Sequence, residues 1–381
     1  MNMHSFSNIK RLLVLPVGGG NDGISSLWLL RQLASMGLNP DIIDMVCMLP
    51  DGIQYHQVIE THCPGLFEIQ ASVYRTINHQ KIKDFPEPTL AGSKDRFGIR
   101  KIYGAQLTAG SSGFSQTLQR LVKAGKYELL LAVDVGGDFI ALPENIKVLS
   151  PFMDAYGAFA LQELQDAKLV DMIGAVMGLG TDGETEPSLL PKTLSAISPF
   201  LDGVLDAKML EPVTEFYINQ VKALRRSQTG DLMVDALRGN LKSSYTVSRY
   251  FHVLTEAGSQ KYTAQQTFQL DGQYTKKFYL FDNFKLITNR FVCPCSSSLE
   301  WLSKTQDSRF RFQHELVNQV IEDTLVATPS WVFPEETKHK ILNAIGDGLR
   351  TGLYQKAVVY KQDLESLGHA PNITIIGNAS E

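Results

Sequence analysis

Apolar and polar positions alternate along the first half of the chain in blocks typical of strands and helices. Four segments are apolar nearly throughout, as expected for strands covered on both faces: Ile9–Val17, Asp41–Leu49, Tyr127–Val135 and Leu169–Met177. Between them, apolar residues recur at helical spacing, most clearly at Phe114, Leu118, Leu121 and Val122. This alternation predicts an α/β fold with a mostly parallel, doubly wound, Rossmann-like sheet.

The pattern changes beyond about residue 190. Long helical stretches near residues 209–227 and 308–327 predict a helix-rich C-terminal half. We therefore expect an α/β core over residues 1–195 and a helix-rich, mixed region over residues 196–381. Whether this second region packs on the same core is left open by the sequence.

Three shorter features add detail to the C-terminal half. Residues Thr267–Leu286 alternate like strands around Asp271-Gly272, which predicts a hairpin. Pro334 and the acidic residues after it predict the start of a helix. Ile373–Ile376 is expected to be a short strand.

Charge and cysteine content narrow the class of protein. The 381 residues carry 36 basic and 40 acidic side chains, a net charge of −4, which gives no electrostatic basis for binding nucleic acid or an anionic membrane. Four cysteines form no disulfide framework. No segment approaches the roughly 20 apolar residues of a membrane span, and the first apolar run has no cleavage pattern. A cytoplasmic location is expected, with export that needs no N-terminal signal left open.

Glycine- and aspartate-rich loops follow the predicted strands. They are Gly18–Gly23, Asp134–Asp138 and Gly178–Glu184, and a fourth segment, Ser150–Asp154, leads into a predicted helix. In an open parallel sheet, ligands bind beyond the carboxyl ends of the strands. We therefore expect these loops to meet in one small-molecule site.

The first and third loops share the pattern G-x-G-[NT]-D-G, which also satisfies the dinucleotide fingerprint. Asp22 and Asp182 lie within them and would repel a diphosphate at close range. A bound cation would reverse that objection. A P-loop is excluded because Ile24 stands where the phosphate-binding lysine is required.

Carboxylates in such loops can hold a divalent cation or act as general acid or base. We predict that Asp134, Asp138 and Asp22 are catalytic, and that Asp134, Asp138 and Asp182 hold Mg²⁺ or Mn²⁺. The predicted ligand-binding residues share these loops and are Gly19, Gly20, Asn21, Gly136, Gly137, Asp154, Gly180, Asp182 and Glu184.

A purely structural interpretation is available for most of these residues. Asp22, Asp138 and Asp154 each precede a predicted helix and could cap it, and Asp182 could be a turn residue. Asp134 resists this interpretation because it follows an almost unbroken apolar run, where an unpartnered carboxylate is costly to bury.

Taken in order, GGGND (Gly18–Asp22), VDVGGD (Val133–Asp138), SPxxDA (Ser150–Ala155) and GxGxDGE (Gly178–Glu184) resemble the DUF1152 family, a domain of unknown function. The resemblance implies no substrate. It implies that these four segments are shared between members, and with them the polar residues Asn21, Asp22, Asp134, Asp138, Asp154, Asp182 and Glu184.

These observations support a metal-assisted hydrolase or transferase acting on a phosphorylated or ribosyl, nucleotide-like substrate. Two alternatives remain. One is a nucleotide- or dinucleotide-binding protein, either an oxidoreductase or a non-catalytic sensor, that needs no divalent cation. The other is a protein-interaction module with a vestigial site.

Overall fold

The computed structural model describes residues 6, 8–18, 22–50, 54–77, 80–83, 85–145, 148, 151–197, 201–206, 211–222, 229–255, 258–287, 291–305, 320–321, 324–326, 335–353, 356–360, 364–368, 370 and 373–376. Within these ranges no helix combines the length and the apolar character needed to cross a bilayer.

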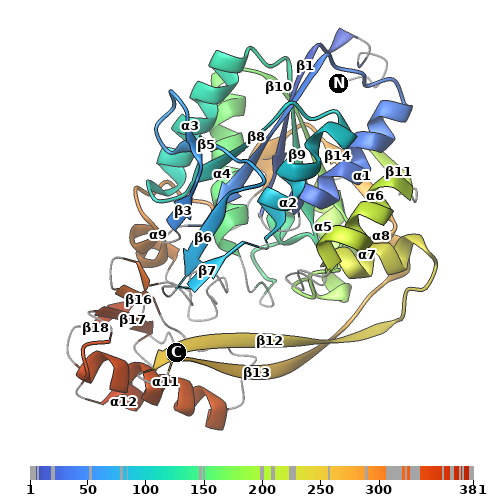
Figure 1. Cartoon of the computed structure of the whole chain (residues 1–381). Helices are drawn as coiled ribbons and strands as arrows, with labels where there is room; N and C mark the ends of the chain where they lie inside the picture. The colour runs from blue at the N-terminus through green and yellow to red at the C-terminus, as the bar shows by residue number, and fades with distance from the viewer. Residues whose placement is uncertain are drawn as a thin grey trace.

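A nine-stranded sheet forms the centre of the molecule (Figure 1). In spatial order the strands are β11 (Leu201–Asp206), β14 (Lys277–Phe281), β10 (Asp171–Met177), β9 (Leu129–Val135), β1 (Arg11–Pro16), β2 (Ile42–Leu49), β8 (Lys101–Gln106), β5 (Leu66–Glu68) and β4 (Ile59–Glu60). The five strands from β10 to β8 run parallel. β14 is antiparallel to both of its neighbours, β5 is antiparallel to β8, and β4 is antiparallel to β5.

Both faces of this sheet are buried beneath helices. Successive residues of a strand point to opposite faces, so Leu13 and Leu15 of β1 join one apolar cluster and Leu12 and Val14 join another. The first cluster includes α3 (Gly110–Gly125) and α4 (Pro151–Ala167), and the second includes α1 (Asp22–Ser35) and α2 (Pro86–Ser93). This double burial explains why the central strands are apolar without alternation.

The order of the parallel strands brings two loops together. From β1 the chain passes through α1 to β2 and then reaches β8 on the same side. It next passes through α3 to β9, which pairs with the other edge of β1, and through α4 to β10. The connections after β1 and β9 therefore leave in opposite directions, so the loops that follow these two adjacent strands diverge from a common place at the carboxyl edge.

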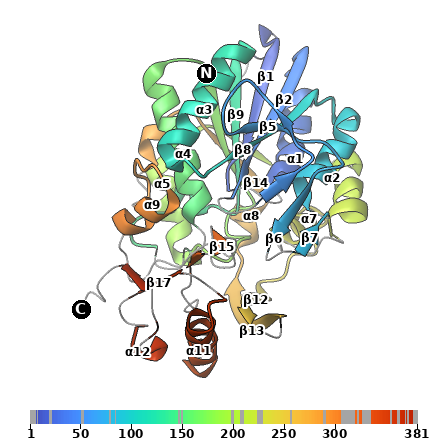
Figure 2. The ribbon, with the colours of Figure 1, turned by 60° about the vertical axis from the view of Figure 1, so that its left-hand side comes forward.

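Residues beyond 196 contribute both to the main sheet and to separate elements. β11 and β14 extend the main sheet, and α5 (Leu190–Ile197), α6 (Glu211–Phe216), α7 (Thr229–Leu237), α8 (Gly272–Thr275) and α9 (Ser298–Thr305) lie around it. Figures 1 and 2 show the ribbon of β12 (Ser244–Thr255) and β13 (Gly258–Gln269) below the main sheet in both views.

Small sheets and two further helices complete the described chain. One sheet consists of β3 (Gln54–His56), β6 (Tyr74–Ile77) and β7 (Gln80–Ile82), and the other of β15 (Val320–Ile321), β16 (Thr324–Val326), β17 (Lys356–Tyr360) and β18 (Ile373–Ile376). The helices are α11 (Glu335–Arg350), which packs on β12, and α12 (Leu364–Leu367). The helix expected after Pro334 and the strand expected at Ile373–Ile376 are confirmed.

The mixed α/β class and the mostly parallel sheet are confirmed, but two predictions for the C-terminal half are wrong. Helices and strands both occur in that half. The described part of the expected helix at residues 308–327 is β15 and β16. No hairpin forms around Asp271-Gly272, because β13 pairs with β12 while β14 pairs with β10 and β11.

An ion pair between a buried carboxylate and a half-exposed arginine ties β2 to the residue before β8. Asp44 has no exposed side-chain surface, and its carboxylate accepts from Nε of Arg100 at 3.0 Å, from a terminal nitrogen of Arg100 and from the Tyr127 hydroxyl. Replacing Arg100 by leucine should lower the free energy of unfolding by about 1.5–3 kcal/mol, since the carboxylate loses charge-assisted bonds but remains buried. Urea unfolding at neutral pH measures this.

The matched control is Arg96→Leu, which removes an ion pair to Glu215 between half-exposed side chains. Its loss should cost about 0–1 kcal/mol. Equal losses in the two variants would contradict the structural role assigned to the Asp44–Arg100 pair.

Candidate functional site

Asp134 lies at the carboxyl end of β9 and is fixed by the pleat of that strand. Asp134 lies two residues after Ala132 and four after Leu130 on the strand, so its side chain is expected on the same face of the sheet as theirs, the face that α3 and α4 cover. Only 1% of its surface is exposed. A carboxylate therefore lies at the end of an apolar strand, on the face that α3 and α4 cover.

Two glycines turn the chain back after β9. Gly136 and Gly137 have φ values of 123° and 114°, which strongly favour glycine. A Cβ at Gly136 would lie 2.7 Å from Cβ of Asp182, so the Asp134–Asp138 loop also packs closely against the Gly178–Glu184 loop. The turn presents Asp138 at the start of a short 3₁₀ helix, with 6% of its surface exposed.

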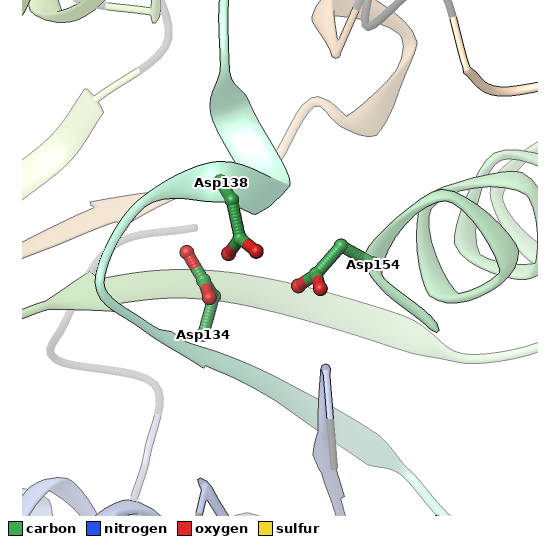
Figure 3. Close-up of side chains that lie close together, drawn as sticks. All are labelled: Asp134, Asp138 and Asp154. Atoms are coloured by element: carbon green, nitrogen blue, oxygen red, sulfur yellow. The ribbon is translucent and has the colours of Figure 1, made fainter. Parts of the chain in front are cut away.

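Asp154 reaches the same place from the first turn of α4. Gly157 allows this approach, because a Cβ there would lie 2.7 Å from Cγ1 of Val17, the residue after β1. Figure 3 shows the carboxylates of Asp134, Asp138 and Asp154 pointing toward one another. One oxygen from each lies within 4.8 Å of the others, and all three side chains are buried.

Further carboxylates surround these three. Asp22 begins α1, and its Oδ2 lies beside Gly18, as does the Asp154 carboxylate. Asp182 accepts from the Glu184 amide at 2.9 Å, and Glu184 is 3% exposed. Asp22, Asp182 and Glu184 all act electrostatically on Asp138.

Burial and mutual repulsion disfavour the charged form of each central carboxyl group. Burial raises the pKa of Asp134 well above its ordinary value, and Asp138 and Asp182 raise it further. Burial likewise raises the pKa of Asp138, with Asp154 and Glu184 adding to the effect. The pKa of Asp154 is raised by burial, then by Asp134 and Asp22. The most strongly acting neighbours of all three are therefore other acids.

Three carboxylate oxygens of the cluster have no hydrogen-bond donor among the described residues. Both oxygens of Asp134 and Oδ1 of Asp154 are buried and accept no hydrogen bond from the residues that the structure describes. The amides of Val135 and Gly137 lower the Asp134 pKa, opposing the effect of burial, although neither reaches hydrogen-bonding geometry. Buried carboxylate oxygens without donors are uncommon and indicate a missing partner, such as a water molecule or an ion.

The structure brings together most of the residues expected from the sequence. Asp22, Asp134, Asp138, Asp154, Asp182 and Glu184 interact with one another, and Gly136, Gly137 and Gly180 shape the adjoining loops. The predicted metal set contained Asp182, whereas the tight cluster contains Asp154 in its place. Gly19, Gly20 and Asn21 lie outside the described residues.

The capping interpretation does not hold for Asp138 or Asp154. The N-cap of the 3₁₀ helix is Gly137, so Asp138 lies inside that helix. Asp154 is likewise inside the first turn of α4, which begins at Pro151. Neither residue is therefore the N-cap of the helix in which it lies.

Sequence reasoning missed polar residues that support the third loop. Asn145 donates its Nδ2 to the Glu184 carbonyl at 2.9 Å and is 2% exposed. From β13, Gln266 donates to the Gly183 carbonyl at 3.5 Å, and Phe268 occupies the space beside Gly183. Single polar residues in loops give no periodic signal, and the ribbon is distant in sequence, so neither contact could be predicted.

A cavity of about 790 Å³ lies elsewhere, at the amino ends of β9 and β10. It is lined by residues that include Glu128, Lys168 and Asp171. The seven residues of β9 span roughly 23 Å at 3.3 Å per residue. The cavity is therefore separate from the carboxylates.

A comparison with known protein families finds a match. The family described as "Protein of unknown function (DUF1152)" matches residues 59–250. That range contains the loops after β9 and β10 and the start of α4, whereas Gly18 and Asp22 precede it. No curated protein and no solved structure matches the chain.

Proposed function

Because the chain belongs to the DUF1152 family, whose function is unknown, we propose a function from its site: a metal-assisted hydrolase or transferase for a phosphorylated or ribosyl substrate. The centre is the cluster of Asp134, Asp138 and Asp154. The observation that carries the proposal is the state of Asp134, which is 1% exposed and has two oxygens without a donor among the described residues.

Burial of an ion without a partner costs several kcal/mol. A divalent cation among the three carboxylates would offset this cost and the repulsion between them. The donor set consists of carboxylate oxygens, which suit Mg²⁺ and Mn²⁺. The residues present therefore fit such an ion, and Asp134, Asp138 and Asp154 would hold it.

When bound, the cation would neutralise charge on a phosphoryl group and lower the pKa of a coordinated water. The surrounding acids would act on the substrate and water directly. Asp182 and Glu184 would accept from substrate hydroxyl groups, and Asp22, which acts electrostatically on Asp138 and Asp154, would orient water.

The strand order favours a nucleotide-like substrate. We interpret β8-β2-β1-β9-β10 as the doubly wound, Rossmann-like order, in which ligands bind where neighbouring connections diverge. The cluster lies at that place, after β9 and beside Gly18 after β1. Substrate phosphates would then reach the cation from beyond the carboxyl edge of the sheet.

The same strand order supports a second candidate, a nucleotide-binding protein that needs no divalent cation. Electrostatics oppose it. Several carboxylates in mutual contact would repel a diphosphate unless a cation lay between them. We therefore rank the metal-assisted function first.

A thermal-shift screen separates the two candidates. We expect Mg²⁺ or Mn²⁺ to raise the melting temperature, because a ligand bound only by the native state stabilises it by about 2.7 kcal/mol at 100 times its dissociation constant. Nucleotides and sugar phosphates should add a further shift only when the cation is present. KCl at matched ionic strength is the control. A nucleotide shift without a divalent cation would favour the second candidate, and no cation-specific shift would contradict the first.

A further inference from the structure

Asp154 lies close to Asp134 and Asp138 and also to Asp22. Asp134 and Asp138 belong with it to the tight cluster. A Cβ at Gly18 would lie 2.6 Å from Oδ2 of Asp22 and 3.0 Å from Oδ1 of Asp154, so these two oxygens converge on the backbone at the end of β1. Asp154 is 3% exposed, and its Oδ1 accepts no hydrogen bond from a described residue.

We propose, resting on the cation site proposed above, that this centre holds two divalent cations bridged by Asp154. The first lies among Asp134, Asp138 and Asp154. The second lies between Asp154 and Asp22, beside Gly18, where a phosphate of the substrate completes its coordination.

The charge of the centre favours more than one ion. The acids that act on one another there are Asp22, Asp134, Asp138, Asp154, Asp182 and Glu184. A single divalent cation offsets only two of their negative charges when they are ionised, and an incoming phosphate adds more. A second cation would lower the remaining repulsion enough for an anionic substrate to approach.

The geometry at Gly18 suits such an ion. In two-metal sites the ions lie about 3.5–4 Å apart, which lets one carboxylate bind both through its two oxygens. Oδ2 of Asp22 and both oxygens of Asp154 lie 2.6, 3.0 and 3.2 Å from the point that a Cβ at Gly18 would occupy, so the two residues offer three carboxylate oxygens on one side of the Gly18 backbone, with no side chain of Gly18 between them. Mg²⁺ commonly takes one or two carboxylates and fills its remaining positions with water and substrate phosphate.

Counting bound Mn²⁺ tests the proposal. The full-length protein is titrated with Mn²⁺, free ion is measured by electron paramagnetic resonance, and the bound signal is recorded at low temperature. We expect two bound ions per chain and a spectrum showing magnetic coupling between them. Asp22→Asn should bind one ion and lose the coupling. Inorganic phosphate should raise the affinity of the unaltered protein for the second ion but should have no such effect on the variant.

Asp41→Asn is the matched control, because this exposed residue precedes β2 at the opposite edge of the sheet. It should retain two ions. One ion in both the unaltered protein and Asp22→Asn would overturn the two-cation inference and leave the proposed function intact. Two ions in Asp22→Asn would overturn the position assigned to the second. No bound ion in the unaltered protein would overturn the proposed function itself.

The two-cation inference can be tested even if circular dichroism shows that Asp22→Asn is unfolded. The electron paramagnetic resonance spectrum of the unaltered protein at saturating Mn²⁺ then provides the test. A coupled pair supports the inference, and an isolated ion overturns it.

Discussion

Asp134→Asn is expected to abolish cation binding while making the cation-free protein more stable. The asparagine has nearly the shape of the aspartate but carries no charge, so the cost of burying an unpartnered carboxylate disappears. We expect a gain of about 1–3 kcal/mol in the free energy of unfolding without cation. Loss of a residue that only hydrogen-bonds to a metal ligand already costs roughly 10–100-fold in metal affinity, so loss of a direct ligand should cost at least about 100-fold.

Calorimetry with Mg²⁺ or Mn²⁺ measures the affinity, and urea unfolding in EDTA measures the stability. Asp41→Asn makes the same chemical change at an exposed position and should alter neither quantity. A lower stability for Asp134→Asn in EDTA would mean that the carboxylate has a stabilising partner in the protein. Unchanged cation affinity would remove Asp134 from the site.

The opposite signs of these two effects separate function from structure. Neutralising a carboxylate that stabilises the fold lowers the stability of the protein, whereas neutralising one that is retained for a ligand raises it. Natural proteins commonly tolerate such destabilised residues where activity requires them. Asp44 shows the contrast within the same chain, since its carboxylate is equally buried but accepts bonds from Arg100 and Tyr127.

The central strands could be predicted because burial on both faces leaves an apolar run. β8 (Lys101–Gln106) was missed because its sequence is broken by polar residues and by Gly104. The structure explains that glycine, since a Cβ there would lie 2.4 Å from Cδ1 of Leu49 on the adjacent strand. Asp271-Gly272 was misinterpreted as a hairpin turn, because Asp271 instead caps α8 by accepting from the Gln273 amide. Local turn chemistry does not reveal which strands pair.

The site could be predicted as a set of loops but not as a geometry. Strand-end positions identified Asp134 and Asp138, since both follow one apolar run. The inclusion of Asp154 depends on the close approach of α4 to the end of β1, which Gly157 permits against Val17. That contact joins segments far apart in sequence and has no local pattern. The contribution of β13 through Gln266 is hidden for the same reason.

Without a divalent cation, the protein should become more stable as the pH falls from neutral toward about 5. The pKa values of Asp134, Asp138 and Asp154 are raised in the folded state, whereas an unfolded aspartate has a pKa of about 3.9. Between these values the folded protein binds more protons than the unfolded chain. Stability therefore decreases as the pH rises above about 4 and is regained as the pH is lowered again.

Exposed carboxyl groups act in the opposite direction but weakly. The pKa of Glu300 is lowered to about 2 by Lys304 and Ser296, and the pKa of Glu336 is lowered by Lys340. Both side chains are solvated, so their contribution is screened and small. The buried cluster should dominate the pH dependence between about 5 and 7.

Saturating Mg²⁺ should remove or reverse this trend, because the cation binds ionised carboxylates and competes with protons for them. Melting temperatures measured across this pH range in EDTA and in Mg²⁺ should therefore converge at the acidic end and diverge toward neutral pH. Asp134→Asn provides the internal comparison, since it should flatten the curve in EDTA and abolish the effect of Mg²⁺. Parallel curves for the unaltered protein would show that the carboxylates titrate independently of any cation, and would contradict the metal centre.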